Sequence, residues 1–544
     1  MSLLMSVHDI TAELPNGSVL FKNFSFSLIK GEKVALIGNN GVGKSMLLSF
    51  LRNENRPKNG HIILQGKVSF LPQKINDFNN FTLAEILNVS MILSALSRAD
   101  KGLANSNDIN LIGEDWDLRN RIDSILNNLS LNYLTLDRTG STLSGGELIR
   151  CLFARILLEN PDFILMDEPT NNLDMQSKKH LFESLNISDA GMLIVSHDRE
   201  LLNKMDRILE ISNLGLRSYG GNFDFYLEQK QIEDKAAIKK IVQAEENLKK
   251  QSLLNTELKD KQSHKSSHGK IRALREGMSV IEMKSKEGSA QKTSAHLQKV
   301  HEKRVNVAKE KLDFAKEKIR DNFTIHIDIE KSKIPSNKEM LICKDLNFKF
   351  QNSEFYFWKE NLNFEIIGNK RVSIFGRNGS GKTTLIKLIT GELRPSLGEI
   401  KIGSKKIAIL DQTCSLLEED QTVLENMQKF GKMEVKTHEL RIRAGRFLFY
   451  GDDVFKKIKY LSGGERLRAA LACLLATNNA PDIFILDEPT NNLDLNSIEI
   501  LKNSLNIYTG LLIIISHDSF FLKELNVNFS IYLERYENGF ENKK

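Results

Sequence analysis

Two glycine-rich segments have the spacing of a phosphate-binding loop. Gly38-Asn39-Asn40-Gly41-Val42-Gly43-Lys44-Ser45 returns as Gly376-Arg377-Asn378-Gly379-Ser380-Gly381-Lys382-Thr383. In such a loop backbone N–H groups surround the phosphates, the lysine meets the outer phosphates, and the terminal hydroxyl coordinates Mg²⁺. One match could arise by chance, but two matches, each between an aliphatic run and a helical pattern, predict nucleotide binding. The predicted binding residues are Gly38, Asn39, Asn40, Gly41, Gly43, Lys44 and Ser45, and Gly376, Asn378, Gly379, Gly381, Lys382 and Thr383.

Paired acids and a histidine accompany each loop. Asp167-Glu168 and Asp487-Glu488 each end an aliphatic run, so the aspartate is predicted to help hold Mg²⁺ and the glutamate to act as general base for the attacking water. His197 and His517 each follow the glutamate by 29 residues, after another aliphatic run. A lone histidine is more often structural, but the matched spacing favours a contact to the terminal phosphate.

The duplication of these motifs, and of Leu-Ser-Gly-Gly-Glu at 143–147 and 461–465, predicts two homologous domains. Aliphatic runs before the motifs and amphipathic stretches after them predict an α/β fold with a buried, largely parallel sheet and the motifs at strand ends. The first copy is 21 residues longer between its glutamine and its Ser-Gly-Gly, because Gln73 precedes Ser144 by 71 residues and Gln412 precedes Ser462 by 50. We expect this insertion, an arm at about 91–120, to be a small surface excursion.

The segment between the two copies has helical composition. Residues 222–268 and 289–334 contain neither Gly nor Pro, whereas Gly269, Gly277 and Gly288 interrupt the span between them. This pattern predicts two helices of roughly 30 to 45 residues, about 45 to 65 Å long at 1.5 Å per residue, joined by a tip at about 269–288. The expected domains are residues 1–222, a linker at 223–334 that forms an antiparallel coiled coil, and residues 335–544.

Composition and charge exclude several classes of protein and indicate a partner for the linker. Hydrophobic residues make up 41% and charged residues 27% of the 544 residues, which excludes wholesale disorder and an integral membrane protein. The scattered cysteines argue against zinc and iron-sulfur sites, and the N-terminus does not resemble a secretion signal, so a cytoplasmic protein is expected. Residues 230–320 hold 23 Lys and Arg against 13 Asp and Glu, although the whole chain carries only +6, so the linker is expected to meet a polyanion. A charged coiled-coil spacer is the alternative for this linker.

Ser144-Gly145-Gly146 and Ser462-Gly463-Gly464 resemble the signature of the ATP-binding cassette superfamily. With the phosphate loops, the Asp-Glu-Pro-Thr-Asn-Asn-Leu-Asp segments and the histidines, this resemblance covers nearly everything outside the linker. It implies that each ATP lies between one loop and the other cassette's signature, so Lys44 would share a site with Ser462 and Lys382 with Ser144. Both sites look competent, and the cassettes would dimerise within one monomeric chain. The resemblance adds Gln73 and Gln412 to the expected Mg²⁺ ligands Ser45, Asp167, Thr383 and Asp487.

One position departs from the superfamily pattern. The resemblance implies an aromatic residue that stacks on adenine ahead of each phosphate loop. Phe350 has this place in the second copy, whereas the spacing puts Leu14 in the first copy. Base stacking at the first site is therefore expected to be weaker, unless a neighbour such as Phe21 substitutes.

Tandem cassettes with a Lys-rich helical linker, a short arm and the segment 219–230 resemble the ABC-F group. That resemblance implies a ribosome-binding protein without a membrane domain, whose linker reaches toward tRNA in the exit-site region and the peptidyl transferase centre. Both antibiotic-resistance ribosome protection and stalled-ribosome rescue stay open, and the apolar residues near the tip slightly favour protection. The alternative is the ATPase subunit of an ABC transporter, which would normally lack the hairpin and the arm. The linker residues expected to contact RNA or tRNA are Lys261, Lys265, Arg272, Arg275, Lys299, Lys303 and Arg304.

Overall fold

The structure is a computed structural model of the chain. It describes residues 3–535 except 15–16, 74–75, 172, 213–214, 276–299, 301–302, 314–333, 336, 351–354, 412, 432–435 and 476–479, and side chains are not described at 76, 255 and 258–275. The contacts divide the chain into two units, one of residues 1–223 with 325–544 and the other of Asp224–Thr324. Both copies of the motifs therefore lie in the first unit.

Two sheets form the described part of the first cassette. The larger has the order β5-β6-β7-β3-β8-β9 and is parallel except for β9, and the smaller is the antiparallel sheet β2-β1-β4. Every residue of β6 and β7 is buried, as expected where helices cover both faces of a parallel sheet. The strands are β1 (Leu3–Glu13), β2 (Val19–Ile29), β3 (Lys33–Gly38), β4 (Asn59–Leu64), β5 (Val68–Leu71), β6 (Phe163–Asp167), β7 (Gly191–Val195), β8 (Arg207–Ser212) and β9 (Gly215–Gly220).

The second cassette repeats this arrangement. Its parallel sheet has the order β14-β15-β16-β12-β17, and its antiparallel sheet has the order β11-β10-β13. The prediction of two α/β domains with parallel sheets is confirmed. The strands are β10 (Glu339–Asn347), β11 (Leu362–Ile367), β12 (Arg371–Phe375), β13 (Leu397–Ile402), β14 (Ile407–Leu410), β15 (Ile483–Asp487), β16 (Leu511–Ile515) and β17 (Phe529–Tyr532).

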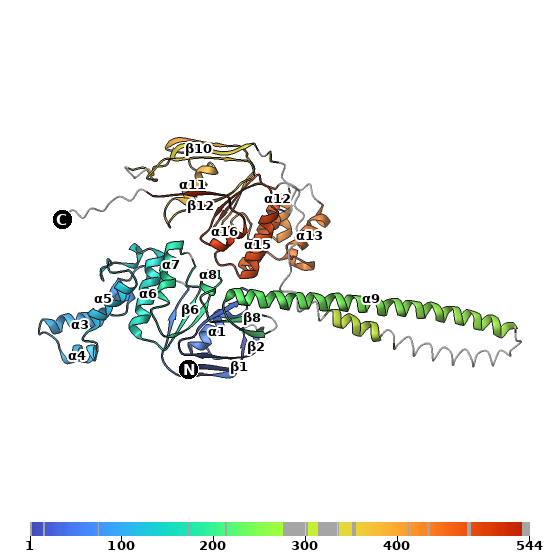
Figure 1. Ribbon diagram of the computed structural model, residues 1–544, viewed down its shortest axis with the longest axis horizontal. Helices are drawn as coiled ribbons and strands as arrows, with labels where there is room; N and C mark the ends of the chain where they lie inside the picture. Colours follow the sequence, from blue (N-terminus) through green and yellow to red (C-terminus); the bar gives the residue numbers. More distant parts are fainter. Residues whose placement is uncertain are drawn as a thin grey trace. The chain divides into compact units, whose positions relative to one another are not determined.

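Helices follow the strands that end in motifs (Figure 1). In the first cassette they are α1 (Lys44–Leu51), α2 (Leu83–Ile86), α3 (Ser90–Asp100), α4 (Ser106–Ile112), α5 (Leu118–Asn128), α6 (Gly145–Glu159), α7 (Met175–Ser184) and α8 (Arg199–Leu202). In the second they are α11 (Lys382–Ile389), α12 (Val423–Phe430), α13 (Thr437–Arg446), α14 (Gly463–Leu475), α15 (Leu495–Ile507) and α16 (Ser519–Glu524). Because β3 lies between β7 and β8, the loops after β3, β6 and β7 meet at one edge of the sheet.

The arm is helical, which its Asn- and Asp-rich composition did not indicate. It consists of α3 and α4, which extend from α5 and α6 (Figure 1). Asn105 caps α4 with a capping box through Asp108, and Arg98 of α3 forms an ion pair with Asp108. Ala95, Leu96 and Ile112 are buried, so the two short helices have a small apolar contact.

The first linker helix is longer than predicted. α9 runs without interruption over 53 residues, Phe223–Arg275, which is about 80 Å at 1.5 Å per residue. The prediction that Gly269 begins the tip was wrong, because a single glycine costs a helix only about 1 kcal/mol and does not end it. Residues 303–313 are also helical, and Ala308 and Leu312, one turn apart, are buried. The rest of the predicted tip, residues 276–288, lies outside the described residues, and the antiparallel pairing stays a prediction.

None of the described helices is both long enough and apolar enough to span a bilayer.

Candidate functional site

The two phosphate loops have the same backbone geometry. Gly43 and Gly381 stand directly before α1 and α11 with φ of 103° and 93°, a left-handed conformation that favours glycine. A Cβ at Gly43 would lie 3.0 Å from the Phe21 ring, and one at Gly381 would lie 2.4 Å from the Phe357 ring. Glycine at these positions therefore allows the left-handed turn and the close approach of the aromatic ring. The turn leads directly into the helix, whose first N–H groups face the loop.

The loop lysine contacts the histidine that follows the glutamate by 29 residues in both cassettes. Lys44 Nζ donates to the Gly38 carbonyl at 2.6 Å and lies 3.1 Å from His197 Nε2. Lys382 Nζ donates to the Gly376 carbonyl at 2.8 Å and also lies 3.1 Å from its histidine, His517. In each cassette, the fold thus brings the loop lysine next to a histidine that is more than 130 residues away in the sequence.

The glutamates stand next to these histidines. Glu168 Oε1 lies 3.5 Å from His197 Nε2, and Glu488 Oε1 lies 3.2 Å from His517 Nε2. Both glutamates have positive φ, 48° and 47°, a conformation that costs a non-glycine residue on the order of 1 to 3 kcal/mol and persists where the surroundings impose it. Their backbone N–H groups donate to the ends of β7 and β16 at 2.9 Å, which holds them there.

Four of the residues predicted to hold Mg²⁺ lie where they could do so: Ser45 with Asp167, and Thr383 with Asp487. Ser45 Oγ donates to Asp167 Oδ2 at 3.2 Å, and a hydroxyl beside a carboxylate is the oxygen donor set that Mg²⁺ prefers. Thr383 and Asp487 line one cavity together. Both carboxylate oxygens of Glu488 are buried and accept no hydrogen bond from the described residues, so a group that donates or bridges to them fits this site.

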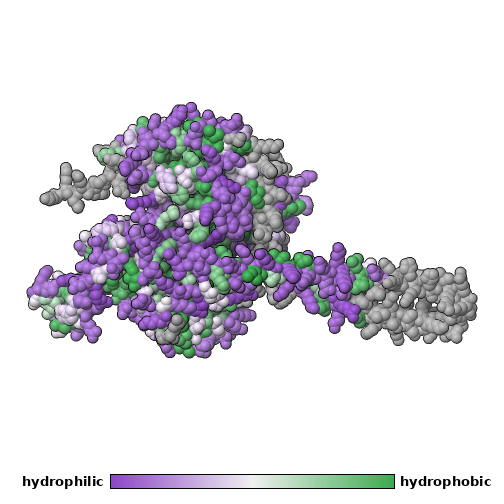
Figure 2. All heavy atoms as spheres, in the orientation of Figure 1, coloured by the Kyte–Doolittle hydropathy of each residue, from purple (hydrophilic) through white to green (hydrophobic). Residues whose placement is uncertain are grey.

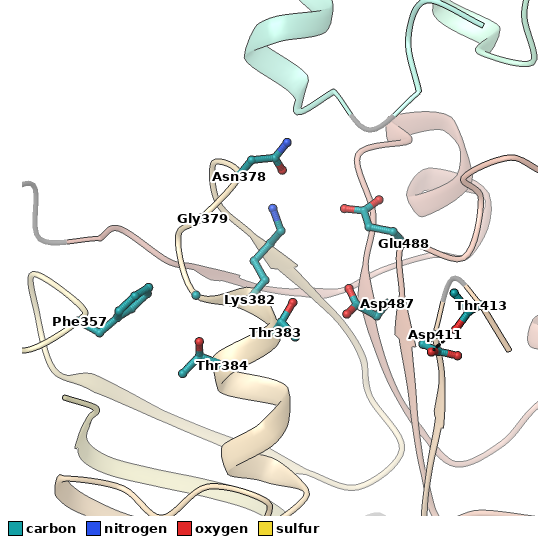
Figure 3. Close-up of a pocket in the computed structure, with 11 residues that line it drawn as sticks. Phe357, Asn378, Gly379, Lys382, Thr383, Thr384, Asp411, Thr413, Asp487 and Glu488 are labelled. Carbon is teal, nitrogen blue, oxygen red and sulfur yellow. Dashed lines mark hydrogen bonds between the residues drawn. The ribbon is translucent and has the colours of Figure 1, made fainter. Parts of the chain in front are cut away.

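A cavity of about 490 Å³ surrounds the second phosphate loop (Figure 3). Phe357 lies on one side of Lys382, and Asp487 and Glu488 lie on the other side at the end of β15. The cavity has the size of a small-molecule site and presents an aromatic ring at one end and carboxylates at the other. Its lining is Phe357, Asn378, Gly379, Gly381, Lys382, Thr383, Thr384, Asp411, Thr413, Asp487 and Glu488.

The two glutamines and the aromatic residue predicted for the second site differ in where the structure places them. Gln73 is exposed and lies just after β5. β5 pairs in parallel with β6, so Gln73 follows the same end of the sheet as Asp167. Gln412 lies outside the described residues. Phe350 is 47% exposed and does not line the cavity; its ring stands edge-on to that of Phe357 at 5.5 Å.

In the first cassette, Leu14 is half-buried and Phe21 is buried. The Phe21 ring stacks on Phe24 with 4.2 Å between ring centroids. One face of Phe21 is therefore already covered.

Each Ser-Gly-Gly segment begins a helix. Ser144 caps α6 with a capping box through Glu147, and Ser462 and Glu465 exchange the same hydrogen bonds at the start of α14. The N-terminal N–H groups of these helices, beginning at Gly145 and Gly463, are suited to an anion. The second glycines, Gly146 and Gly464, leave room for Ser177 and Ser497, whose Oγ atoms would lie 2.2 and 2.3 Å from an added Cβ.

Two aspartates connect the cassettes. Asp494 Oδ1 accepts from Ser497 N at the start of α15, and its Oδ2 accepts from the Asn40 backbone N at 2.8 Å. Asp174 likewise caps α7 and accepts from the Asn378 backbone N at 3.3 Å. Each phosphate loop is therefore bonded to the helix that packs against the other cassette's Ser-Gly-Gly segment.

A family model described as "ABC transporter" matches residues 21–171 and 359–491. ATP-binding protein Uup of Buchnera aphidicola is 30% identical over 99% of this chain and 85% of its own length. ABC transporter F family member 5 of Arabidopsis thaliana is 28% identical over 95% of this chain and 73% of its own length. Energy-dependent translational throttle protein EttA of Escherichia coli is 28% identical over 97% of this chain and 92% of its own length. The chain belongs to the ABC-F group of ATP-binding cassette ATPases.

The solved structure of RNase-L Inhibitor has the same fold, with a TM-score of 0.56 at 19% identity over 96% of this chain and 87% of that chain. ATP binding and ATP hydrolysis are general properties of the ABC ATPase family, whose members typically use Mg²⁺.

Burial shifts the pKa values of the site residues. It raises the pKa of Glu168 to about 8, an effect that Lys44 opposes, and raises that of Glu488 to about 7, opposed by Lys382. Burial and the neighbouring lysines lower the pKa of His197 to about 3 and that of His517 to about 4. The histidines of this ABC-F protein are therefore neutral near pH 7, and each can donate one ring N–H to a phosphate oxygen.

Several site residues were not singled out from the sequence. Phe357 and Asp411 line the cavity, and Asp174 and Asp494 bridge the cassettes. The aspartates end the repeated Asp-Glu-Pro-Thr-Asn-Asn-Leu-Asp segment, so the repetition was a signal for them. Phe357 lies in an aromatic run, 355–358, and only its packing against Gly381 distinguishes it.

Alanine at Gly146 is expected to be more harmful than alanine at Gly464. The Gly146 Cβ would meet both Oγ and Cβ of Ser177, at 2.2 and 2.5 Å, so α6 and α7 must separate. At Gly464 only Ser497 Oγ is closer than 3 Å and a rotation of that hydroxyl relieves the contact. We expect Gly146→Ala to lower the free energy of unfolding by about 1 to 3 kcal/mol, measured by denaturant titration, and Gly464→Ala to lower it less. Equal losses, or no recovery in Gly146→Ala/Ser177→Gly, would contradict this packing.

Glu168→Gln should stabilise the nucleotide-free protein increasingly as pH rises. The folded-state pKa of Glu168, about 8, exceeds the ordinary value of 4.5, so the folded state binds more protons between these values. The stability that the protonated form contributes is complete below pH 4.5 and is lost as pH rises toward 8, whereas glutamine does not titrate. Melting temperatures in EDTA at pH 5 to 8.5 should show a widening difference between variant and parent. A constant difference for Glu168→Gln would refute the prediction.

Proposed function

We propose that this ABC-F protein hydrolyses ATP to ADP and phosphate at two sites. The observation that carries the proposal is the repeated lysine–histidine–glutamate arrangement, with 3.1 Å between lysine and histidine in both cassettes. Lys44 and Lys382 would hold the outer phosphates, His197 and His517 the terminal phosphate, and Glu168 and Glu488 would accept a proton from the attacking water. Mg²⁺, when bound, neutralises developing phosphate charge, and its proposed ligands are Ser45, Gln73, Asp167, Thr383, Gln412 and Asp487.

We further propose that each site is completed by the opposite cassette. Asp494 bonds to both the Asn40 N–H of the first loop and the Ser497 N–H of α15, and Ser497 packs on Gly464 of the second signature. This chain of contacts supports pairing Lys44 with Ser462, Gly463 and Gly464. Asp174 supports the reciprocal pairing of Lys382 with Ser144, Gly145 and Gly146. The adenine would stack near Phe357 at the second site, with Phe350 behind it.

The partner that we propose is the ribosome. One relative is named a translational throttle protein, and the linker of this chain carries a basic excess on a helix of 53 residues. Cassette closure around ATP would move the linker toward tRNA and the peptidyl transferase centre, as ribosome protection against antibiotics or as rescue of stalled ribosomes. Lys303 and Arg304 lie exposed on the helix 303–313, and Lys261, Lys265, Arg272 and Arg275 lie on α9. Lys299 is outside the described residues.

Sedimentation with ribosomes tests this function. A lysate of cells that produce the protein is layered on a sucrose cushion with a non-hydrolysable ATP analogue, and the ribosomal and membrane fractions are probed separately. We expect the protein in the ribosomal pellet with the analogue and less of it with ADP. Recovery with membranes, or sedimentation that does not depend on the nucleotide, would overturn the proposal and favour the transporter subunit.

A further inference from the structure

Exposed aromatic residues concentrate in one short segment of the second cassette. Among the described residues, three of the six aromatic side chains that are at least half exposed lie within 450–460. They are Tyr450 at 54%, Phe455 at 50% and Tyr460 at 75% exposed. Burying such rings would be favourable, so this exposure marks a surface that a partner can cover.

Tyr450 and Phe455 lie along one face of α13. The Tyr450 ring stands 3.7 Å from the position of a Cβ on Gly445, and the guanidinium of Arg441 lies 5.6 Å over the Phe455 ring. Arg441 and Gly445 are four residues apart and therefore neighbours on the helix surface, one turn apart. We call Arg441, Tyr450, Phe455, Lys456 and Lys457 the α13 patch, and Figure 2 shows mainly hydrophilic residues with apolar ones among them near this helix.

The segment that carries the patch is basic, although two of its cations, Lys459 and Arg466, form ion pairs with Asp420 and Glu419. Residues 436–468 contain nine Lys and Arg against four Asp and Glu, whereas the matching residues of the first cassette, 118–150, contain four against three. Lys456 pairs with Asp453 at 2.8 Å, but both side chains are more than 40% exposed, so this pair is weak and can exchange for a phosphate. Lys457 is also exposed.

The patch is not a requirement of the cassette fold. Thr139 and Lys457 form equivalent strand bridges with Thr82 and Thr422, which aligns the two cassettes at this point. By the same spacing Asp137 stands in the first cassette where Phe455 stands in the second. The first cassette also has a cation, Arg138, at the position of Lys456, and an exposed ring, Tyr133, one residue from the position of Tyr450. The second cassette differs in having a second exposed ring, Phe455, and a second lysine, Lys457.

We propose that the α13 patch binds RNA in a single-stranded or looped region, with bases stacked on Tyr450 and Phe455 and phosphates bound by Lys456 and Lys457. Aromatic faces beside cations are the combination with which proteins bind unpaired nucleotides. An acidic protein would use the cations but has no need of two exposed rings. The inference rests on the proposed function, because it gives the second cassette its own contact with ribosomal RNA.

Two variants of the full-length protein separate the contribution of the aromatic rings from that of the lysines. The first replaces both rings, Tyr450→Ser with Phe455→Ser, and the second replaces both cations, Lys456→Gln with Lys457→Gln. The matched control is Lys359→Gln with Lys401→Gln, because these lysines are exposed and pair only loosely with Glu534 and Glu399, at 3.6 and 3.7 Å. Thermal melting and ATPase activity of all variants should equal those of the parent.

The probe is a fluorescein-labelled single-stranded 12-mer of uridine, titrated at several salt concentrations. We expect the ring variant to bind roughly ten-fold or more weakly. The lysine variant should lower the slope of log affinity against log salt by about 1.4, or about 0.7 for each lysine. The control should bind as the parent does. No binding by the parent, equal competition by polyglutamate, or a ring variant that binds like the control would overturn the inference.

Ribosome sedimentation of the same proteins distinguishes the two proposals. If the parent does not sediment with ribosomes but binds the 12-mer through the patch, the proposed function fails and the RNA surface stands. If the parent sediments and the ring variant sediments equally at every salt concentration, the ribosomal function stands and the patch is not its contact.

Discussion

Replacing Glu168 and Glu488 together with glutamine is expected to lower ATP hydrolysis by about 10² to 10⁴ while ATP binding is preserved. Glutamine has the size of glutamate, so it can stay beside His197 and His517, but it cannot accept a proton from water. Both glutamates are held at the strand ends by backbone hydrogen bonds at 2.9 Å, which the substitution does not touch. The loss should therefore appear in turnover and not in affinity.

Single-turnover kinetics and equilibrium binding of a fluorescent ATP analogue measure the two quantities separately. The single variants Glu168→Gln and Glu488→Gln assign turnover to each site, and Lys44→Ala with Lys382→Ala serves as the contrast that should lose binding itself. A double glutamine variant that hydrolyses ATP near the parent rate would show that these carboxylates are not the general bases. One that fails to bind ATP would show that they hold the nucleotide.

The parts of the site that sequence reasoning located are those with fixed local spacing. Lys44 must follow Gly38 by six residues to fold back on the loop, and Asp167 and Glu168 must end a strand, so both can be read from a linear pattern. Duplication of each pattern removed the ambiguity of a single match. The histidines were found only because the interval of 29 residues occurs twice.

The remaining features of the site and the fold depend on tertiary contacts, which the spacing of residues in the sequence does not reveal. Phe357 reaches the cavity because Gly381 has no Cβ and lets its ring approach. Phe350, which has the expected spacing, does not line the cavity and stands edge-on to the Phe357 ring. The helical arm arises from a capping box and one ion pair inside a segment whose composition is typical of a loop. α9 passes through Gly269 because helix formers on both sides outweigh the cost of one glycine.

The last prediction concerns how the cassettes act at a distance through the linker. Removing residues 270–287 is expected to abolish the effect on translation or on drug tolerance, while ATPase activity and ribosome sedimentation stay near the parent level. A helix of 53 residues is about 80 Å long, so rotation of its base by a few degrees moves its far end by several Å. The deletion leaves Lys249 and Lys250, exposed cations nearer the base of α9, in place for attachment to RNA phosphates.

The matched control keeps residues 270–287 at the same length and composition but scrambles their order, and it should fail as the deletion does if the tip acts through specific side chains. A second variant, Lys249→Gln with Lys250→Gln, should do the opposite and weaken sedimentation at moderate salt while the tip remains intact. The readouts are translation in a reconstituted system with ribosomes stalled by an antibiotic, and drug tolerance of a sensitive host. If the deletion protein retained the full effect in both assays, the linker would be only a spacer between the cassettes. Its basic excess would then need another explanation, and the α13 patch would become the principal candidate for the contact with RNA.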